Sequence, residues 1–379
     1  MFKPISLILS SIASWVSFSQ AAEKNVIFFI TDDESPTLGC YGDPVAKTPA
    51  IDALAKDGTL FENAFATTAS CSASRSVVLS GLHNHANGQY GHQHAFHKFA
   101  SYHNVIGLSL PRAMTAAGYR TGQIGKYHVA PEEVYQFETY LKGSARNAVK
   151  MAEQAKEFIT MDSEKPFFLY FATSDPHRGG GKDLTSERKL KPDLFGNKPN
   201  RTHHEGVKEV FYDPKTVPIP SFLTDTPETR EELVHYYQSV SRIDQGVGRL
   251  IEILKEAELY EKTLIVFTSD HGMAFAGGKT TVYEGGLKVP FVVRNPYEEK
   301  RGIRQSALIS HIDITPSLLD FIGALDPEKK RPKQWIDPNK YWKEKTYVAK
   351  ENRGSTGKLS SYHGRSWIPI LGKPKAKHW

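Results

Sequence analysis

The sequence predicts an α/β fold, in which a mostly parallel central sheet is sandwiched between helices. Three observations lead to this prediction. Short apolar runs of strand length alternate along the chain with longer amphipathic segments of helical period. Several of these runs end directly in charged residues, as strands buried on both faces of a parallel sheet do. The 379 residues are 39% hydrophobic and 11% aromatic, which is enough for a large buried core and excludes a disordered chain.

The expected elements follow one another in a regular order. The first strand is the apolar run 25–31, and the first helix begins at Thr48-Pro49 and ends before Gly58. Further strands are expected at 119–124, 167–173, 263–268 and 290–293, and further helices at 110–117, 145–159, 226 to about 259, and 315–321. Residues 178–224 are rich in Gly, Pro, His and Lys without a clear period, which predicts a long irregular insertion.

Polar residues stand where four of the predicted strands end. They are Asp32 and Asp33, Lys126 and His128, His177, and Asp270 and His271. Because the carboxyl ends of parallel strands share one edge of a sheet, we expect these residues to converge on one site. Three carboxylates beside a histidine suit a divalent cation, and oxygen-rich ligation favours calcium or magnesium over zinc. Taken alone, Asp32-Asp33 could equally form a turn or cap a helix.

The stretch 70–81 places Cys71 in the first turn of a predicted helix, with Arg75 four residues later. Cys40 is the only other cysteine, so Cys71 could be a buried core residue or form a disulfide with Cys40 in an oxidising compartment. Cationic side chains accompany the carboxylates: Arg75, Lys126, His128, His177 and Lys279. Such a set could bind a compact multivalent oxyanion, although each cation alone could be a solvated surface charge.

Residues 1–22 have the pattern of a secretory signal peptide. Lys3 precedes an apolar stretch at 5–18, and 19–22 supply small residues at a cleavage point. The apolar part is short for a membrane span, although an uncleaved anchor is the alternative. We expect an exported protein without a stable membrane anchor, either periplasmic or extracellular, or lysosome-like in a eukaryote. The net charge of +6 suits a polyanionic partner, but no nucleic-acid-binding motif is present and no nucleic acid is expected.

Seven ordered stretches resemble the sulfatase family, within the alkaline phosphatase-like superfamily. They are N-V-I-F-F-I-T-D-D at 25–33, C-S-A-S-R followed by L-S-G at 71–81, G-Y-R-T-G-Q-I-G-K-Y-H at 118–128, P-F-F-L-Y-F-A-T-S-D-P-H at 166–177, T-S-D-H-G at 268–272, G-K-T-T-V-Y-E-G-G at 278–286 and H-G-R-S-W-I-P-I-L at 363–371. Among sulfatases the chain is most similar to N-sulfoglucosamine sulfohydrolases (sulfamidases), through the stretches 71–91, 125–135, 174–178 and 242–248.

Three positions depart from the patterns of that family. The pentad at Cys71 resembles the signature C-x-P-x-R, but Ala73 stands where the family usually has proline. His271 stands where asparagine is more frequent, and Lys279 stands where sulfamidases tend to have arginine.

The resemblance implies that a maturation enzyme oxidises Cys71 to formylglycine, the catalytic nucleophile. It implies a calcium ion held by Asp32, Asp33, Asp270 and His271 together with the modified Cys71. A hydroxyl of the aldehyde hydrate would attack sulfur, and the second hydroxyl would then expel sulfate and restore the aldehyde.

The resemblance also gives roles to the cationic residues. Arg75 would orient the formylglycine, and Lys126 and His128 would bracket its hydrate. His177 and Lys279 would grip the sulfate, and one of the two would protonate the departing amine or hydroxyl.

The implied function is that of an exported sulfohydrolase acting on a sulfated glycan, with N-sulfoglucosamine of heparin or heparan sulfate as the first expectation. The alternatives are an O-sulfatase for another polysaccharide, a phosphate or phosphonate ester hydrolase of the same superfamily, and a non-catalytic glycan binder if Cys71 is unmodified. The expected partners are the glycan and the maturation enzyme, and a homodimer is left open.

The resemblance also predicts how the chain is divided. A signal peptide is expected at 1–22, a catalytic α/β domain at 23–330, and the truncated start of a C-terminal region at 331–379. Sulfatases generally continue into a smaller C-terminal domain built on an antiparallel sheet, which we expect to be largely missing here.

Overall fold

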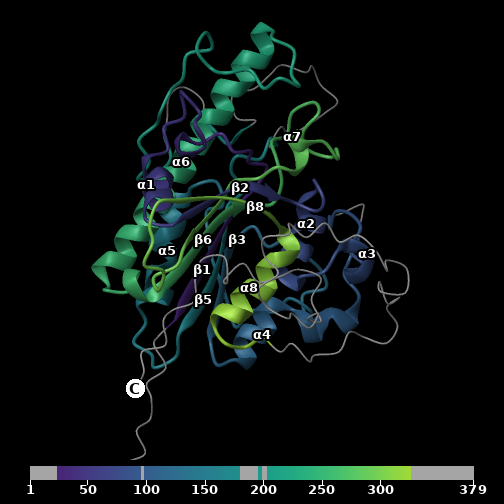
Figure 1. Ribbon diagram of the computed structural model, residues 1–379, viewed down its shortest axis with the longest axis vertical. Coiled ribbons are helices and arrows are strands. Elements are labelled where there is room, and N and C mark those ends of the chain that lie inside the picture. Colours follow the sequence, from purple (N-terminus) through teal and green to yellow (C-terminus); the bar gives the residue numbers. More distant parts are fainter. Residues whose placement is uncertain (1–23, 95–97, 180–194, 199–202, 326–379) are drawn as a thin grey trace, which may run out of the picture.

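The structure is a computed structural model that describes residues 24–94, 98–179, 195–198 and 203–325. An eight-stranded sheet lies at its centre, in the order β4-β3-β5-β1-β6-β7-β2-β8 (Figure 1). The strands are β1 Asn25–Thr31, β2 Thr59–Phe65, β3 Arg120–Gly125, β4 Thr139–Leu141, β5 Phe167–Ala172, β6 Thr263–Ser269, β7 Phe291–Arg294 and β8 Ile303–Ser310. Only β7 runs antiparallel to its neighbours, β6 and β2. The predicted α/β fold with a mostly parallel sheet is therefore confirmed.

Helices cover both faces of this sheet (Figure 1). One face carries α1 Pro49–Lys56, α5 Ala148–Thr160 and α6 Pro227–Glu256. The other face carries α2 Cys71–Ser80, α4 Leu110–Ala116 and α8 Ile314–Phe321. Two short helices, α3 Asn84–Asn87 and α7 Glu284–Leu287, lie in connecting segments. All the helices and strands predicted from the sequence are found, with bounds that differ by a few residues.

The central strand β1 shows why its sequence is a continuous apolar run. Val26, Phe28 and Ile30 pack into the core beneath α2, α4 and α8. Ile27 and Phe29 pack into the opposite core, beneath α1, α5 and α6. Each of these side chains is at most 1% exposed, and burying one contributes roughly 1.5–3 kcal/mol. The two layers of helices thus hold the strand that delivers Asp32 and Asp33.

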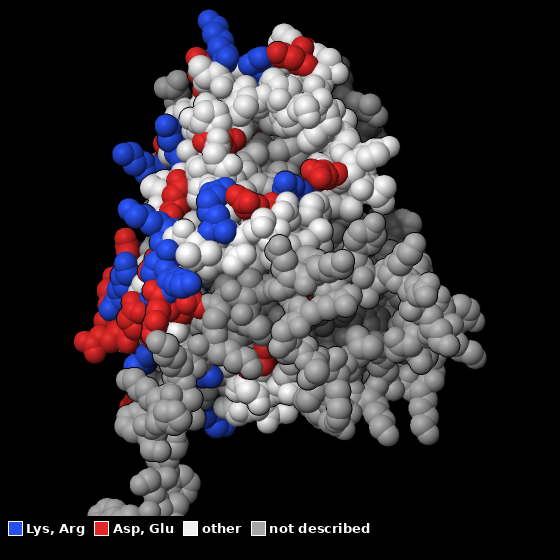
Figure 2. Space-filling model, in the orientation of Figure 1, with Lys and Arg blue, Asp and Glu red and all other residues white. Residues whose placement is uncertain are grey.

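The long helix α6 illustrates how local sequence signals set the bounds of an element. Thr226 caps its first turn by accepting a hydrogen bond from the Thr229 backbone N–H at 3.2 Å, and Pro227 occupies the first helical position. Figure 2 shows acidic and basic side chains intermixed over the side of the molecule where α5 and α6 lie. Because the charges on that side alternate in sign, they form no uniformly basic surface there.

Several predictions fall on residues that the structure does not describe. These are the signal peptide at 1–22, the region 331–379 and the loss of a C-terminal antiparallel domain; the boundaries of the catalytic domain also stay predictions. The described parts of the insertion at 178–224 contain no α-helix or strand, in agreement with an irregular segment. None of the helices in the described ranges combines the length and the apolar character needed to cross a membrane.

His311 is a fully buried histidine that links stability to pH. It follows β8, and its Nδ1 lies 3.0 Å from the Ser74 hydroxyl on α2. Burial lowers the pKa of His311 to about 3, so the folded chain keeps it neutral where an unfolded chain, with a pKa near 6.5, takes up a proton. The contribution of neutral His311 to the free energy of unfolding is therefore fully present above about pH 6.5. It is lost progressively as pH falls towards 3.

We expect the His311→Leu variant to lose less stability on acidification than the unmodified chain. Between pH 7 and pH 5 the difference in the free energy of unfolding should be about 2 kcal/mol, the linkage of one proton over this interval. Urea unfolding at both pH values measures it, with His103→Leu, an exposed histidine, as the control. Equal pH slopes for the His311→Leu variant and the unmodified chain would contradict the assignment.

Candidate active site

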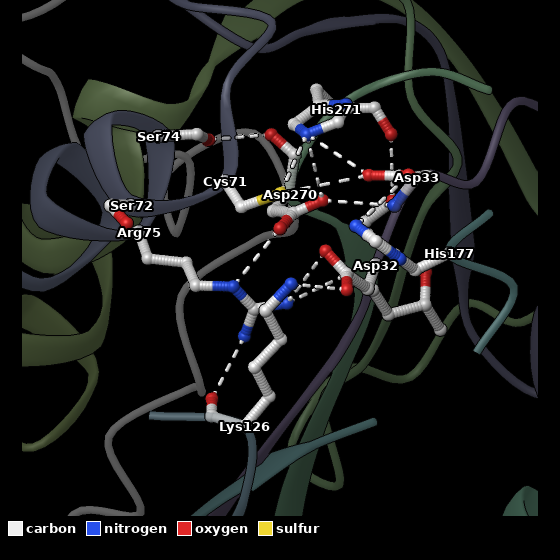
Figure 3. Close-up of polar contacts among 12 residues, drawn as sticks. Asp32, Asp33, Cys71, Ser72, Ser74, Arg75, Lys126, His177, Asp270 and His271 are labelled. Carbon is white, nitrogen blue, oxygen red and sulfur yellow. Dashed lines mark hydrogen bonds and ion pairs between the residues drawn. The ribbon is translucent and has the colours of Figure 1, made fainter. Parts of the chain in front are cut away.

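The residues singled out from the sequence converge at one edge of the sheet (Figure 3). The strands β1, β3, β5 and β6 end beside one another and deliver Asp32 and Asp33, Lys126 and His128, His177, and Asp270 and His271 respectively. Cys71 is the first residue of α2, and Lys279 lies in the loop before α7. The structure therefore brings all the predicted site residues together, while the role of each remains a proposal.

Cys71 lies at the centre of this group as a buried free thiol. Its Sγ is 3.3 Å from His271 Nε2, 3.2 Å from Lys279 Nζ and 3.7 Å from Asp33 Oδ1. Cys40 is also a free thiol, which excludes the disulfide alternative. Burial raises the pKa of Cys71 well above its ordinary value, and neighbouring carboxylates raise it further. An unmodified Cys71 is therefore protonated at neutral pH and a weak nucleophile.

In the first turn of α2, position 73 accepts either alanine or proline as far as backbone hydrogen bonding is concerned. The first backbone hydrogen bond of the helix runs from Ser74 N–H to Ser70 C=O, at 2.8 Å. The Ala73 N–H precedes it and is one of the first-turn donors that have no partner within a helix. A proline at this position would therefore remove no hydrogen bond of the helix. Backbone hydrogen bonding in α2 thus does not distinguish alanine from proline at position 73.

Arg75 joins the ends of three strands from the interior. Its Nε donates to Asp270 Oδ2 at 2.9 Å, and its Nη2 lies 3.6 Å from Asp32 Oδ1. Its Nη1 donates to the Lys126 backbone carbonyl at 3.1 Å and to the Tyr170 hydroxyl at 3.3 Å. Arg75 and both carboxylates are fully buried. The guanidinium therefore fixes β1, β3 and β6 relative to one another while it forms ion pairs with two carboxylates.

The carboxylates of the site are balanced by lysines. Lys126 Nζ forms an ion pair with Asp32, and Lys279 Nζ lies 2.8 and 2.9 Å from the two oxygens of Asp33. Burial alone would raise the pKa of Asp32, but the charges of Lys126 and Arg75 outweigh burial and hold this pKa well below its usual range. By contrast, burial raises the pKa of Asp270, and the charge of Asp32 raises it further. The two carboxylates thus differ in how strongly the surrounding cations stabilise their charge.

This arrangement fits a divalent cation. The ligand atoms of Asp32, Cys71, Asp270 and His271 all lie within 4.8 Å of one another. Asp32 Oδ1 is buried yet takes part in no hydrogen bond, as expected of an oxygen that faces an ion. His271 Nδ1 lies 3.0 Å from the Gly272 carbonyl, which can only accept, so the Nδ1–H donates and Nε2 keeps a lone pair for a metal. Oxygen-rich ligands favour hard ions such as calcium or magnesium over zinc.

Three residues of the site adopt a left-handed backbone although they are not glycine. Their φ angles are 68° at Asp33, 55° at His128 and 67° at Thr280, next to Lys279. Such conformations cost on the order of 1 kcal/mol or more each and persist only where the surrounding structure imposes them. Gly272 is needed for a steric reason instead, because a Cβ at this position would lie 2.1 Å from the Gly285 carbonyl oxygen. The loop after β6 therefore packs directly against the start of α7.

His177 is positioned by a cluster of arginines behind the site. Arg146 donates to the His177 carbonyl at 2.8 Å and to Asp175 Oδ1 at 3.1 Å. Arg242, from α6, donates to the second Asp175 oxygen at 2.7 Å. His177 Nε2 lies 3.9 Å from Asp33 Oδ2, and burial lowers the pKa of His177, so its imidazole is neutral at pH 7. The segment that carries His177 is thus anchored to α6.

His92 belongs to the site but was not identified from the sequence. Its ligating atom lies within 4.8 Å of those of Cys71 and His128. It lies in the loop after α3, where no strand end or helical period draws attention to it. The only signal in the sequence is the density of histidines that begins at His83, with His85, His92 and His94.

Comparison with known proteins agrees with this geometry. The sulfatase family model matches residues 24–324. Human N-sulphoglucosamine sulphohydrolase is 37% identical over 80% of this chain and 62% of its own length. An ulvan-active sulfatase of Formosa agariphila is 30% identical over 82% of this chain and 56% of its own length. The chain therefore spans roughly three fifths of the length of these relatives.

A solved structure from a study of glycosaminoglycan metabolism by Bacteroides thetaiotaomicron has a TM-score of 0.68. It covers 94% of this chain and 78% of the solved chain at 17% identity, which shows the shared fold alone. The match to the family model covers most of the chain and includes every residue of the site. The chain belongs to the sulfatase family.

Proposed function

We propose that this protein is an exported sulfohydrolase that removes sulfate from a sulfated glycan, and that its substrate is N-sulfoglucosamine in heparin or heparan sulfate. The observation that carries the proposal is Cys71, a buried thiol of raised pKa surrounded by Asp33, His271 and Lys279. As a thiol it is poorly suited to attack, but as formylglycine it would be central to an anion-binding site. The human relative, named for N-sulphoglucosamine, supports the choice of substrate.

In this proposal, one group of residues around Cys71 holds the metal ion and a second group positions the modified side chain. When formed from Cys71 by a maturation enzyme, formylglycine supplies a hydrated aldehyde as the nucleophile, and a calcium ion supplies positive charge to the sulfate. Asp32, Asp33, Asp270 and His271 would hold that ion together with the modified Cys71, and Arg75 would orient the modified side chain. Lys126 and His128 would bracket it.

Lys279 and His177 would bind the sulfate and the departing group. Burial lowers the pKa of Lys279, but the charge of Asp33 outweighs burial and raises it above its usual value, so Lys279 keeps its proton at neutral pH. Neutral His177 can donate one N–H hydrogen bond. Lys279 is thus the cation that can stabilise negative charge on the sulfate, and one of the two residues would protonate the departing amine or hydroxyl.

A second candidate is an O-sulfatase that acts on another sulfated polysaccharide. The ulvan-active relative and the lysine at position 279 favour it. Sulfate release from N-sulfoglucosamine, glucosamine 6-O-sulfate and sulfated ulvan oligosaccharides, measured beside hydrolysis of a phosphate diester to its monoester and alcohol, separates the candidates. We expect N-sulfoglucosamine to have the largest kcat/KM. A larger value for an O-sulfate would replace the proposed substrate, and turnover of the diester alone would replace the reaction.

Ala73 offers a test of maturation, because a proline at this position would remove no backbone hydrogen bond of α2. We expect Ala73→Pro to raise the fraction of Cys71 converted to formylglycine without changing the fold, since the change restores the signature that the family usually carries. Mass spectrometry of the peptide that holds Cys71 measures this fraction from a mass loss of about 18 Da relative to the thiol. An unchanged fraction in a host with an active maturation enzyme would show that Ala73 is not limiting.

Removal of divalent metal provides a separate test of the calcium site. A chelator is expected to abolish sulfate release, and added calcium is expected to restore it, because the carboxylates of Asp32 and Asp270 would otherwise repel an anionic substrate. Calcium should also raise the thermal unfolding midpoint, since an ion that binds only the folded chain stabilises it. Asp270→Asn should weaken both effects. Full activity after exhaustive chelation would argue against a metal in this site.

A further inference from the structure

A stack of imidazole rings lies beside Cys71. The centroid of the His92 ring is 5.6 Å from that of His128, with 21° between their planes, and 5.3 Å from that of His94, with 23° between their planes. This stack includes His128, which follows β3, and two histidines from the loop after α3. Residues from two distant parts of the chain therefore come together next to the thiol.

The loop that carries His92 is attached to the first turn of α2. His92 Nε2 lies 3.2 Å from the Ser70 hydroxyl, and the next residue, Gln93, donates its backbone N–H to Ser72 Oγ at 2.9 Å. Both serines flank Cys71 in the sequence. The position of His92 is thus set relative to the thiol before any ligand binds, which lowers the free-energy cost of assembling a site.

Three potential ligand atoms meet in this place. One from each of Cys71, His92 and His128 lies within 4.8 Å of the other two. Cys71 is 1% exposed. Nδ1 of His92 and Nδ1 of His128 are both buried and have no hydrogen-bond partner among the described residues. Buried nitrogens without a partner are costly in a folded protein, and a bound ion is one of the ordinary explanations for them.

We infer that the chain, as long as Cys71 is unconverted, binds Zn²⁺ through Cys71 Sγ and one imidazole nitrogen each of His92 and His128. One thiolate and two imidazoles form a ligand set typical of zinc, with the fourth position open. On binding, the S–H bond breaks, a sulfur–zinc bond forms and the proton passes to the solvent, so no oxidant or reductant is needed. This site shares only the sulfur with the oxygen-rich group of Asp32 and Asp270.

The inference does not rest on the proposed function, because it concerns the thiol and not the formylglycine. It has a consequence for any preparation in which conversion is incomplete. A converted chain has lost the sulfur and should not hold zinc in this way. After saturation with zinc and removal of the excess, the zinc content should fall as the formylglycine content rises.

The test uses full-length chain made without a maturation enzyme, with the intact thiol confirmed by mass spectrometry. Zn²⁺ is titrated against a chromophoric chelator, and Co²⁺ serves as a spectroscopic probe of the same site. We expect one Zn²⁺ per chain and a thiolate-to-cobalt charge-transfer band, since the ion bonds to sulfur. His92→Ala and His128→Ala should each weaken zinc binding about tenfold or more.

His94→Ala is the matched control, because His94 stacks on His92 but is not one of the three grouped residues. It should leave zinc binding unchanged. The charge-transfer band is measured on the chain without substitutions. Its absence therefore overturns the inference even if a variant misfolds. The inference also fails if Asp270→Asn abolishes zinc binding while His92→Ala and His128→Ala do not affect it, because the ion would then lie among the carboxylates.

Discussion

Cys71→Ala is expected to abolish sulfate release from every sulfated substrate, with a loss of about 10⁴-fold or more in kcat. The reason is that the proposed reaction passes through a covalent bond to this side chain, and no neighbouring residue can replace it. The fold should persist, because Cys71 is a small side chain whose sulfur is surrounded by the polar groups of Asp33, His271 and Lys279. Sulfate measured by ion chromatography, together with the thermal unfolding midpoint, checks both statements.

Cys40→Ala is the control for that variant, since Cys40 is the only other cysteine and is partly exposed. It should keep full activity. If Cys71→Ala still releases sulfate at a comparable rate, the nucleophile lies elsewhere. If the chain without substitutions is inactive and its Cys71 thiol is intact, the glycan-binding alternative gains support.

Arg242→Met is expected to lower the free energy of unfolding by about 3–5 kcal/mol, the usual result of removing one member of a buried ion pair. Arg242 and its partner Asp175 are 0% and 2% exposed, so the carboxylate loses one of its two cations where water cannot replace it. The Asn197 side-chain oxygen and the Phe195 carbonyl also lose their donor. Chemical denaturation of the purified variant measures the change.

Arg294→Met is the matched control, because Arg294 is equally buried but its partners are not. Its side chain is 1% exposed, whereas Asp57 and Glu261 are 37% and 70% exposed. Water can solvate these carboxylates once the guanidinium is gone, so we expect a loss of about 1 kcal/mol. Equal losses in the two variants would show that burial of the partner does not determine the cost.

Much of the site could be predicted because its residues follow apolar strands. The runs at β1 and β6 are buried throughout and pair in parallel, so the residues that follow them must meet. The Asp33 backbone N–H accordingly donates to Asp270 Oδ1 at 3.0 Å. The periodicity of the chain, together with the rule that parallel strands end at one edge of a sheet, is enough to predict this meeting.

Other features depend on contacts that no local pattern encodes. β8 alternates between partly buried and exposed residues at the edge of the sheet, so it contains no continuous apolar run. β4 is three residues long, and β2 includes Glu62 and Asn63. His92 comes from a loop, and its distance from Cys71 follows from how that loop packs on α2. Only tertiary packing determines these positions.

The left-handed backbone at Asp33 implies a trade-off between stability and activity. Asparagine tolerates this conformation better than most residues, and glycine adopts it without strain. Either substitution would also remove a negative charge from a crowded group of carboxylates. At Asp33, however, relief of the strain is opposed by the loss of the buried ion pair with Lys279. Thr280 forms no such pair, so selection for thermal stability would reward glycine there. An engineered chain in which Asp33 is replaced would lose the carboxylate that Lys279 and His271 contact, so the strain at this position is retained together with the site.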